Sequence, residues 1–188
     1  MCKSMFARLM VMSGVVVMVG AMALPAAADD HNAAKLEREA ISLIEDVEEV
    51  GRDVEYHAER LKLFLAGGID ASRWTHFHHL DQIKWLVNDR LRPALVRLDE
   101  LELILPEWKQ DSVARMIAAA QVVARDASSA FTSKNTSPTT LPVLNAEYRT
   151  LVANMVTHAG TLVTTADAAH TYATAHLKAT EAGLGVPR

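Results

Sequence analysis

The sequence predicts an all-α protein, an up-down-up-down four-helix bundle with long helices. Apolar residues recur at steps of three and four along four long stretches, which is the spacing of an amphipathic helix. Aromatic residues make up only 5% of the 188 residues, and no run of alternating β-branched residues indicates strands. Short connections between such helices make sequential helices antiparallel neighbours.

The first predicted helix runs from Asn32 to Ala66 and keeps one apolar face along its length. The pair Gly67-Gly68 ends it, because glycine favours the left-handed cap and weakens a helix interior. Its expected core positions are Leu36, Ala40, Leu43, Val47, Val50, Val54, Ala58, Leu61 and Leu65.

The second predicted helix runs from Ser72, a good N-cap, to Leu105. Pro93 lies inside it, removes one backbone hydrogen bond and clashes with the carbonyl of Asp89, so we expect a kink at Asp89–Pro93. A complete break is the alternative, but the apolar stripe keeps its phase across the proline. That stripe contains His76, Leu80, Ile83, Val87, Leu91, Ala94, Leu98, Leu101 and Leu105.

The third predicted helix begins at Pro106, where the missing N–H costs little, and the fourth runs from Pro142 to Thr180. The polar, proline-containing segment from Thr132 to Thr140 between them reads as the longest loop. We expect Val113, Ile117, Ala120, Val123, Ala127 and Phe131 to face inward from the third helix. The expected core positions of the fourth are Leu144, Tyr148, Leu151, Met155, Leu162, Ala166, Ala169 and Ala173.

Residues 1–28 are predicted to be a secretory signal peptide. Lys3 and Arg8 form a basic start, and residues 9–24 carry no charge and are mostly apolar. An N-terminal membrane anchor is the alternative, but this stretch is shorter than the ~20 residues that a spanning helix needs. The sole cysteine, Cys2, lies in this segment, so the remaining chain has no disulfide.

Cleavage is expected before Asp29, because Ala26 and Ala28 provide the small residues that signal peptidase requires. The product would be periplasmic or secreted from a bacterium, with a bundle domain over residues 29–182. Residues 183–188, which contain two glycines and a proline, read as a disordered tail. No second apolar span follows, so no transmembrane segment is expected after cleavage.

Charge and motifs exclude several functions. The formal net charge is −4, which argues against nucleic acid as a partner because phosphate binding needs a basic surface. Phosphate-binding glycine loops, the Gly-x-Ser-x-Gly motif and the His-Glu-x-x-His motif are all missing. We therefore expect no catalytic residues, and a non-enzymatic protein.

The histidines suggest a metal site, since four-helix bundles often hold metals between their helices. The expected topology brings residues from three helices to the end of the bundle near the first turn, where a Zn or Cu site with histidine and carboxylate ligands is one interpretation. The alternative is a hydrogen-bonded core histidine with boundary residues around it, and no bound cofactor. The candidate ligands are His57, His76, His79, Asp81 and Glu147.

The second predicted helix also has an outward aromatic face. At 100° per residue, Trp74, His78 and Trp85 lie within about 40° of one another and opposite the core stripe. Large exposed aromatic residues are enriched in interfaces. Three interpretations stay open: a homodimer contact, a surface for a partner protein or small molecule, and a surface covered by the N-terminal tail or the long loop.

Two motifs resemble those of uncharacterised secreted helical-bundle proteins of soil bacteria. They are Trp74-x-x-x-x-His79-Leu80-x-x-Ile83-Lys84-x-x-Val87-Asn88 and Pro106-x-Trp108-Lys109-Gln110. The resemblance implies a secreted helical bundle and no particular activity. Helical periplasmic stress chaperones of the Spy type carry Leu-Thr-x-x-Gln repeats, which this sequence lacks.

Three functional hypotheses follow. The first is a non-enzymatic binding or interaction protein of the cell envelope with an unknown ligand. The second is a periplasmic metal-binding or metal-stress bundle, and the third is a holdase chaperone.

Overall fold

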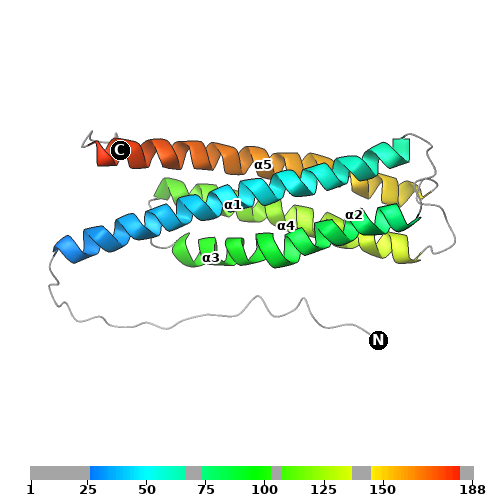
Figure 1. The fold of residues 1–188 in the computed structure, drawn as a ribbon, viewed down its shortest axis with the longest axis horizontal. Helices are drawn as coiled ribbons and strands as arrows, with labels where there is room; N and C mark the ends of the chain where they lie inside the picture. The colour runs from blue at the N-terminus through cyan, green and yellow to red at the C-terminus, as the bar shows by residue number, and fades with distance from the viewer. Residues whose placement is uncertain (1–25, 67–72, 103–106, 137–144, 183–188) are drawn as a thin grey trace, which may run out of the picture.

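The protein is all-helical, as the apolar spacing predicts. The computed structural model describes residues 26–66, 73–102, 107–136 and 145–182, and no strand occurs in these ranges. The elements are α1 (Ala26–Ala66), α2 (Arg73–Trp85), the π-helical segment η1 (Leu86–Leu91), α3 (Arg92–Glu102), α4 (Glu107–Thr136) and α5 (Ala146–Glu181) (Figure 1).

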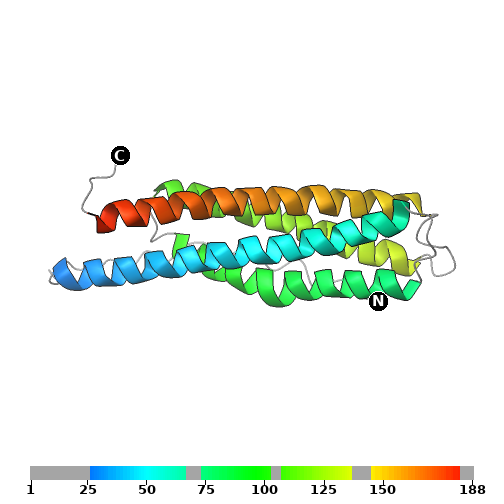
Figure 2. The same ribbon diagram turned by 45° about the horizontal axis from the view of Figure 1, so that its top comes forward.

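The helices lie side by side as an elongated bundle, which the turned view in Figure 2 shows again. Residues 73–102 are helical without interruption, so α2, η1 and α3 form one continuous rod. This rod packs against α1 on one side and α4 on the other, and α5 packs against both α1 and α4. Each rod thus has two neighbours, and the rods together enclose one shared core.

Contacts between side chains fix the relative positions along the bundle. Residue numbers rise along α1 as they fall along α5, because Glu37 lies near His176 and Glu48 near His170. The end of α1, the start of α2, the end of α4 and the start of α5 consequently gather at one end of the bundle (Figure 1).

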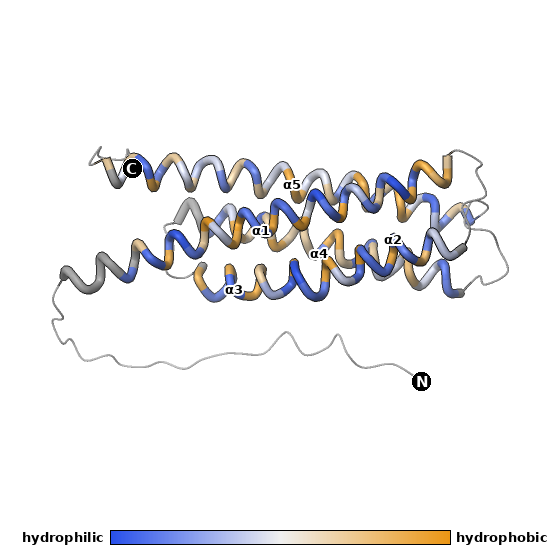
Figure 3. The backbone as a smooth tube through the Cα atoms, in the orientation of Figure 1, coloured by the Kyte–Doolittle hydropathy of each residue, from blue (hydrophilic) through white to orange (hydrophobic). Residues whose placement is uncertain are grey.

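The core follows the predicted apolar faces, and Figure 3 shows hydrophobic and hydrophilic residues alternating along the helices. Some positions are offset by one residue. Ile44 is fully buried while its neighbour Leu43 is only partly buried, and Met116 is buried in place of the expected Ile117. Neighbouring residues on a helix point about 100° apart, so a stripe defines the buried face but not which boundary residue lies deepest.

The helix containing Pro93 continues through the proline and changes its hydrogen-bonding pattern before it. Leu86–Leu91 form the π-helical segment η1, and the backbone N–H of Arg92 donates to the carbonyl of Val87, five residues earlier. A wider turn suits this position because the proline ring would clash with the carbonyl four residues before it. The alternative of a complete break is not observed.

Two helix ends differ from the sequence prediction. Helix α1 begins at Ala26 rather than Asn32, so its first turn contains the expected cleavage residues Ala26, Ala28 and Asp29. Helix α4 extends to Thr136, so the prediction that the loop starts at Thr132 is wrong. The sequence there is polar, but Ser133 is buried and its hydroxyl donates to the Glu147 carboxylate, 3.2 Å away.

The start of α5 is fixed by Asn145, whose side-chain oxygen accepts from the backbone N–H of Tyr148 at 3.0 Å. The first 25 residues of the predicted signal peptide (residues 1–28) and the predicted tail at 183–188 lie outside the described residues, as do the expected helix ends at Ser72, Leu105, Pro106 and Pro142. Among the helices that are described, none is both long and apolar enough to cross a membrane.

Candidate histidine site at one end of the bundle

Imidazole and aromatic rings gather where α1, α2 and α5 meet. We call this group the histidine cluster. Each ring centre lies within about 6 Å of another, so the cluster is continuous from α1 to α5. Its members are His57 and Phe64 from α1, His76, His78 and His79 from α2, and Tyr148 from α5.

His57 and His79 have the shortest distance between ring centres in the cluster. Their Nδ1 atoms are 2.8 Å apart, and their ring centres are 5.1 Å apart with the planes tilted by 54°. Both side chains are half-buried. At this separation one Nδ1–H donates to the lone pair of the other Nδ1, so the pair contains at least one neutral imidazole.

His76 lies deeper, with only 2% of its surface exposed. Its Nδ1 atom is 3.1 Å from the hydroxyl of Tyr148, which is itself fully buried. Phe64 packs edge-on against His76 and also contacts His79, so it touches both the buried histidine and the half-buried pair. His76 is thus a hydrogen-bonded core histidine, the alternative that the sequence left open.

Burial lowers the pKa of all three of these imidazoles. The pKa of His76 falls to about 4, mainly through burial and then through the charges of Lys134 and His79. The pKa of His79 also falls to about 4, through burial and then through His57, His78 and Arg60. The pKa of His57 is lowered by burial, with Asp53 opposing the change. At neutral pH His57, His76 and His79 are therefore neutral imidazoles.

The remaining predicted metal ligands do not join the histidines. Asp81 is exposed on α2, and Glu147 is exposed on α5, where it accepts from Ser133. In the part of the chain that the structure describes, no group of three histidine, cysteine, aspartate or glutamate residues is arranged to hold one metal ion. The structure thus brings together His57 and His79 from the predicted set, and Phe64 contacts both His79 and the nearby His76.

The predicted outward face of α2 is exposed. The side chain of Trp74 is 74% exposed and that of Trp85 is 48% exposed. His78 stacks on Trp74 with ring centres 5.8 Å apart and planes within 9° of parallel. His78 also meets His79 edge-on at 5.4 Å, so the exposed stack is the outermost part of the histidine cluster.

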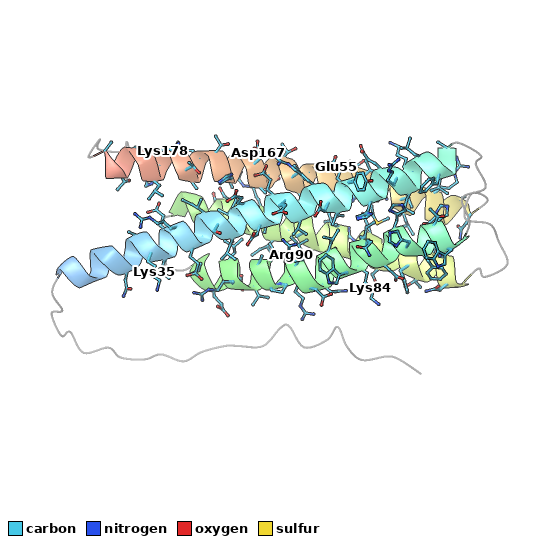
Figure 4. The ribbon with its side chains drawn as sticks, in the orientation of Figure 1. Lys35, Glu55, Lys84, Arg90, Asp167 and Lys178 are labelled. Carbon is cyan, nitrogen blue, oxygen red and sulfur yellow. The ribbon has the colours of Figure 1, made fainter. Side chains whose placement is uncertain are left out.

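The end of α4 supplies a basic group that the sequence analysis missed. Lys134 is buried and its ammonium lies over the ring of Phe77, which packs edge-on against Phe131. On the outer side of α2, the ammonium of Lys84, labelled in Figure 4, lies 5.2 Å from the centre of the same Phe131 ring. The polar sequence around Lys134 did not indicate a buried lysine, because such a sequence is typical of a loop.

The partners of the α5 histidines were also not predicted from the sequence. His158 lies 2.5 Å from the buried carboxylate of Asp126 on α4. His170 lies 3.6 Å from Glu48, a buried carboxylate of α1 that also pairs with Arg52. These contacts link α5 to both of its neighbours and are separate from the histidine cluster.

Comparisons of the chain with protein-family models, with curated proteins and with solved structures find no match.

Proposed function

We propose that this chain is a non-enzymatic helical-bundle protein of the bacterial cell envelope that binds a partner through the outer face of α2. The signal-peptide pattern of residues 1–28 supports the periplasmic or secreted location. The contacts between successive rods support an up-down-up-down four-helix bundle, with a kink of the second rod at Pro93. Such a bundle would hold α2 rigidly and present its outer face to solvent.

The observation that carries this proposal is the exposed stack of Trp74 and His78. An indole that is 74% exposed on a regular helix leaves a large apolar surface in water. Trp85 adds a second exposed indole on the same helix. Tryptophan is among the residues that contribute most to binding at interfaces, so this face is the best candidate for the binding surface.

Site-specific photocrosslinking in cells tests the proposal. A photoreactive phenylalanine analogue would replace Trp74 or Trp85, and a matched control would carry it at Asp167, an exposed position of α5. We expect a discrete adduct from positions 74 and 85 and none from position 167. An adduct of twice the chain mass identifies a homodimer, and one of another mass identifies a different partner. Equal labelling from all three positions, or no adduct, contradicts the proposal.

The expected location can be checked separately. The chain expressed in a bacterium should appear in the periplasm or medium, with a mass that corresponds to an N-terminus at Asp29. Retention of residues 1–28 in the purified protein would contradict the predicted cleavage.

The His57–His79 pair favours a second candidate function, the binding of a transition metal at the same end of the bundle. Two neutral imidazoles with facing nitrogen atoms are ligands of the type that Zn and Cu accept. Elemental analysis of the natively purified protein tests this candidate, which predicts close to one metal ion per chain. A metal-free protein that also takes up no added metal would contradict it.

A further inference from the structure

We infer that the partner at the outer face of α2 is a second copy of this chain, packed antiparallel to the first with Trp85 on the twofold axis. The contact surface runs along α2, η1 and α3, which form one continuous rod (Figure 1). This pairing rests on the binding face proposed above and adds the identity of its occupant. It is independent of the metal-binding candidate.

Exposed apolar side chains recur along the outer side of this rod at intervals of eleven residues. They are Trp74, Trp85 and Val96, which are 74%, 48% and 53% exposed. Eleven residues complete three helical turns to within about 20°, so the three side chains share one face, roughly 33 Å long. Ile83 before η1 and Leu98 after it are both fully buried. The rod therefore keeps the same side towards the core across η1, and the exposed face continues past it.

The equal spacing makes this face complementary to itself when one copy is reversed. In an antiparallel pair centred on Trp85, this indole meets Trp85 of the second copy. Trp74 then lies level with Val96 of the second copy, because both residues are eleven positions from the centre. Each exposed apolar side chain is thus placed against another apolar one. A twofold interface needs such a patch, because the same residues serve on both sides.

The charges between the apolar positions favour the antiparallel direction. Asp81 and Arg92 are exposed on the same face, seven residues after Trp74 and seven after Trp85. In a parallel pair each would face its own copy, so like charges would meet and oppose association. In the antiparallel pair Asp81 lies within one helical turn of Arg92 of the second copy. This pairing of opposite charges occurs once on each side of the twofold axis.

The exposed apolar area indicates a dimer of moderate affinity. A fully buried tryptophan contributes about 150–250 Å², so the four partly exposed indoles of a pair contribute on the order of 500 Å². A stable interface buries about 1,200–2,000 Å² in total, and the polar side chains beside the indoles would have to supply the remainder. We therefore expect association in the micromolar range of protein concentration.

Cysteine crosslinking of the purified chain tests both the pairing and its direction. Asp81→Cys and Asn88→Cys are made separately in a chain whose natural cysteine is removed by Cys2→Ser. Both positions are exposed on the outer face, and both variants keep the three apolar residues. In the antiparallel pair, position 81 of one copy lies level with position 88 of the other. Each position lies roughly 9–12 Å along the axis from its own copy, which is too far for a disulfide.

Oxidation of an equal mixture of the two variants should give a disulfide-linked dimer. Oxidation of either variant alone should give several-fold less of it. Linkage of each variant to itself would show a parallel pair and overturn the inference. A mixture that gives no linked dimer at protein concentrations above the micromolar range would overturn it as well.

Analytical ultracentrifugation provides a second measurement that needs no cysteine. The mass should rise towards twice that of the chain as the concentration increases. Trp85→Glu should weaken association at least about tenfold, because interface tryptophans contribute strongly to binding and the substitution places two carboxylates at the axis. Leu63→Glu is the matched control, since Leu63 is 60% exposed on α1 and lies outside this face. It should leave association unchanged, and equal weakening by both variants would contradict the pairing.

Photocrosslinking at Trp74 and Trp85 separates the two levels of the proposal. A chain that stays monomeric but gives an adduct of another mass keeps the proposed binding face and excludes the second copy as its occupant. A monomeric chain that gives no adduct removes both.

Discussion

The Nδ1 atom of His76 lies 3.1 Å from the hydroxyl of Tyr148, and this contact joins α2 to α5 inside the core. The two residues come from rods that are separated by α4 in the sequence. Desolvation raises the pKa of Tyr148 above its usual value and lowers that of His76, so both groups stay neutral. A neutral hydrogen bond between them satisfies two polar atoms that water cannot reach.

Tyr148→Phe should destabilise the bundle by about 1–3 kcal/mol. The substitution keeps the ring and removes the hydroxyl, so a buried imidazole nitrogen loses its partner and its desolvation is no longer compensated. Urea unfolding followed by circular dichroism measures the change. Tyr56→Phe is the matched control, since Tyr56 is exposed and its hydroxyl only meets Arg60 at the surface. It should change stability by less than about 0.5 kcal/mol. Equal effects of the two variants would contradict the role of the contact.

The bundle should lose stability as the pH falls from about 6.5 to about 4. In this window the unfolded chain protonates His76 at its ordinary pKa of 6.5, but the folded chain resists protonation until about pH 4. The unfolded state then binds more protons, so the free energy of unfolding falls with falling pH. Since one pKa unit corresponds to ~1.4 kcal/mol, His76 alone accounts for up to roughly 3 kcal/mol.

Unfolding curves of wild type and His76→Gln at several pH values check this expectation. The difference between the two proteins isolates the contribution of His76 from those of the other titrating groups. The variant should show a flatter pH dependence between 6.5 and 4. A wild type and a variant with parallel curves across this window would refute the assignment.

The sequence was sufficient to predict the rods and much of their buried faces. Helical spacing of apolar residues is a local signal, and it correctly places Val47, Leu61, Leu98 and Met155 in the core. Levels counted along the expected helices also bring His57, His76 and Tyr148 to the same end of the bundle. This part of the site follows from helix length and turn position alone.

Side-chain pairing could not be predicted in the same way. Whether His79 or Asp81 faces His57 of α1 depends on rotation of α2 by a fraction of a turn, and the apolar stripe does not fix that angle. The burial of Ser133 and Lys134 depends on contacts with α2 and α5, which override a local sequence typical of a loop. The π-helical segment is likewise a compromise between Pro93 and the packing of Leu86, Val87 and Leu91 in the core.

Pro93→Ala should stabilise the second rod and shorten its π-helical segment. Alanine restores a backbone donor and removes the clash with the carbonyl of Asp89, and a proline inside a helix costs about 3 kcal/mol relative to alanine. We expect a gain of about 1–2 kcal/mol, because η1 already relieves part of that cost. Urea unfolding gives the gain, and amide exchange over residues 86–93 reports the added protection. Loss of stability would show that the wide turn is favoured by core packing rather than imposed by the proline.

Gly51 of α1 and Gly160 of α5 each face side chains of the other helix, and their replacement by alanine should have different outcomes. A Cβ atom on Gly51 would meet Val163 Cγ2 at 3.1 Å and the Leu162 side chain at 3.6 Å. A Cβ atom on Gly160 would meet Glu55 Oε1 at 3.0 Å, the far end of a flexible side chain. Alanine gains about 1 kcal/mol over glycine in a helix interior.

For Gly160→Ala this gain should survive, because Glu55 can swing away, and we expect stabilisation of about 0.5–1 kcal/mol. For Gly51→Ala it should be cancelled or reversed, since Val163 is stiff at its first side-chain torsion and overpacking costs about 1–3 kcal/mol. Thermal and urea unfolding of both variants give the comparison. Glu55→Ala combined with Gly160→Ala keeps the full gain if Glu55 is the only obstacle. Equal stabilisation by the two glycine substitutions would show that α1 and α5 separate freely, against the close packing that the structure places between them.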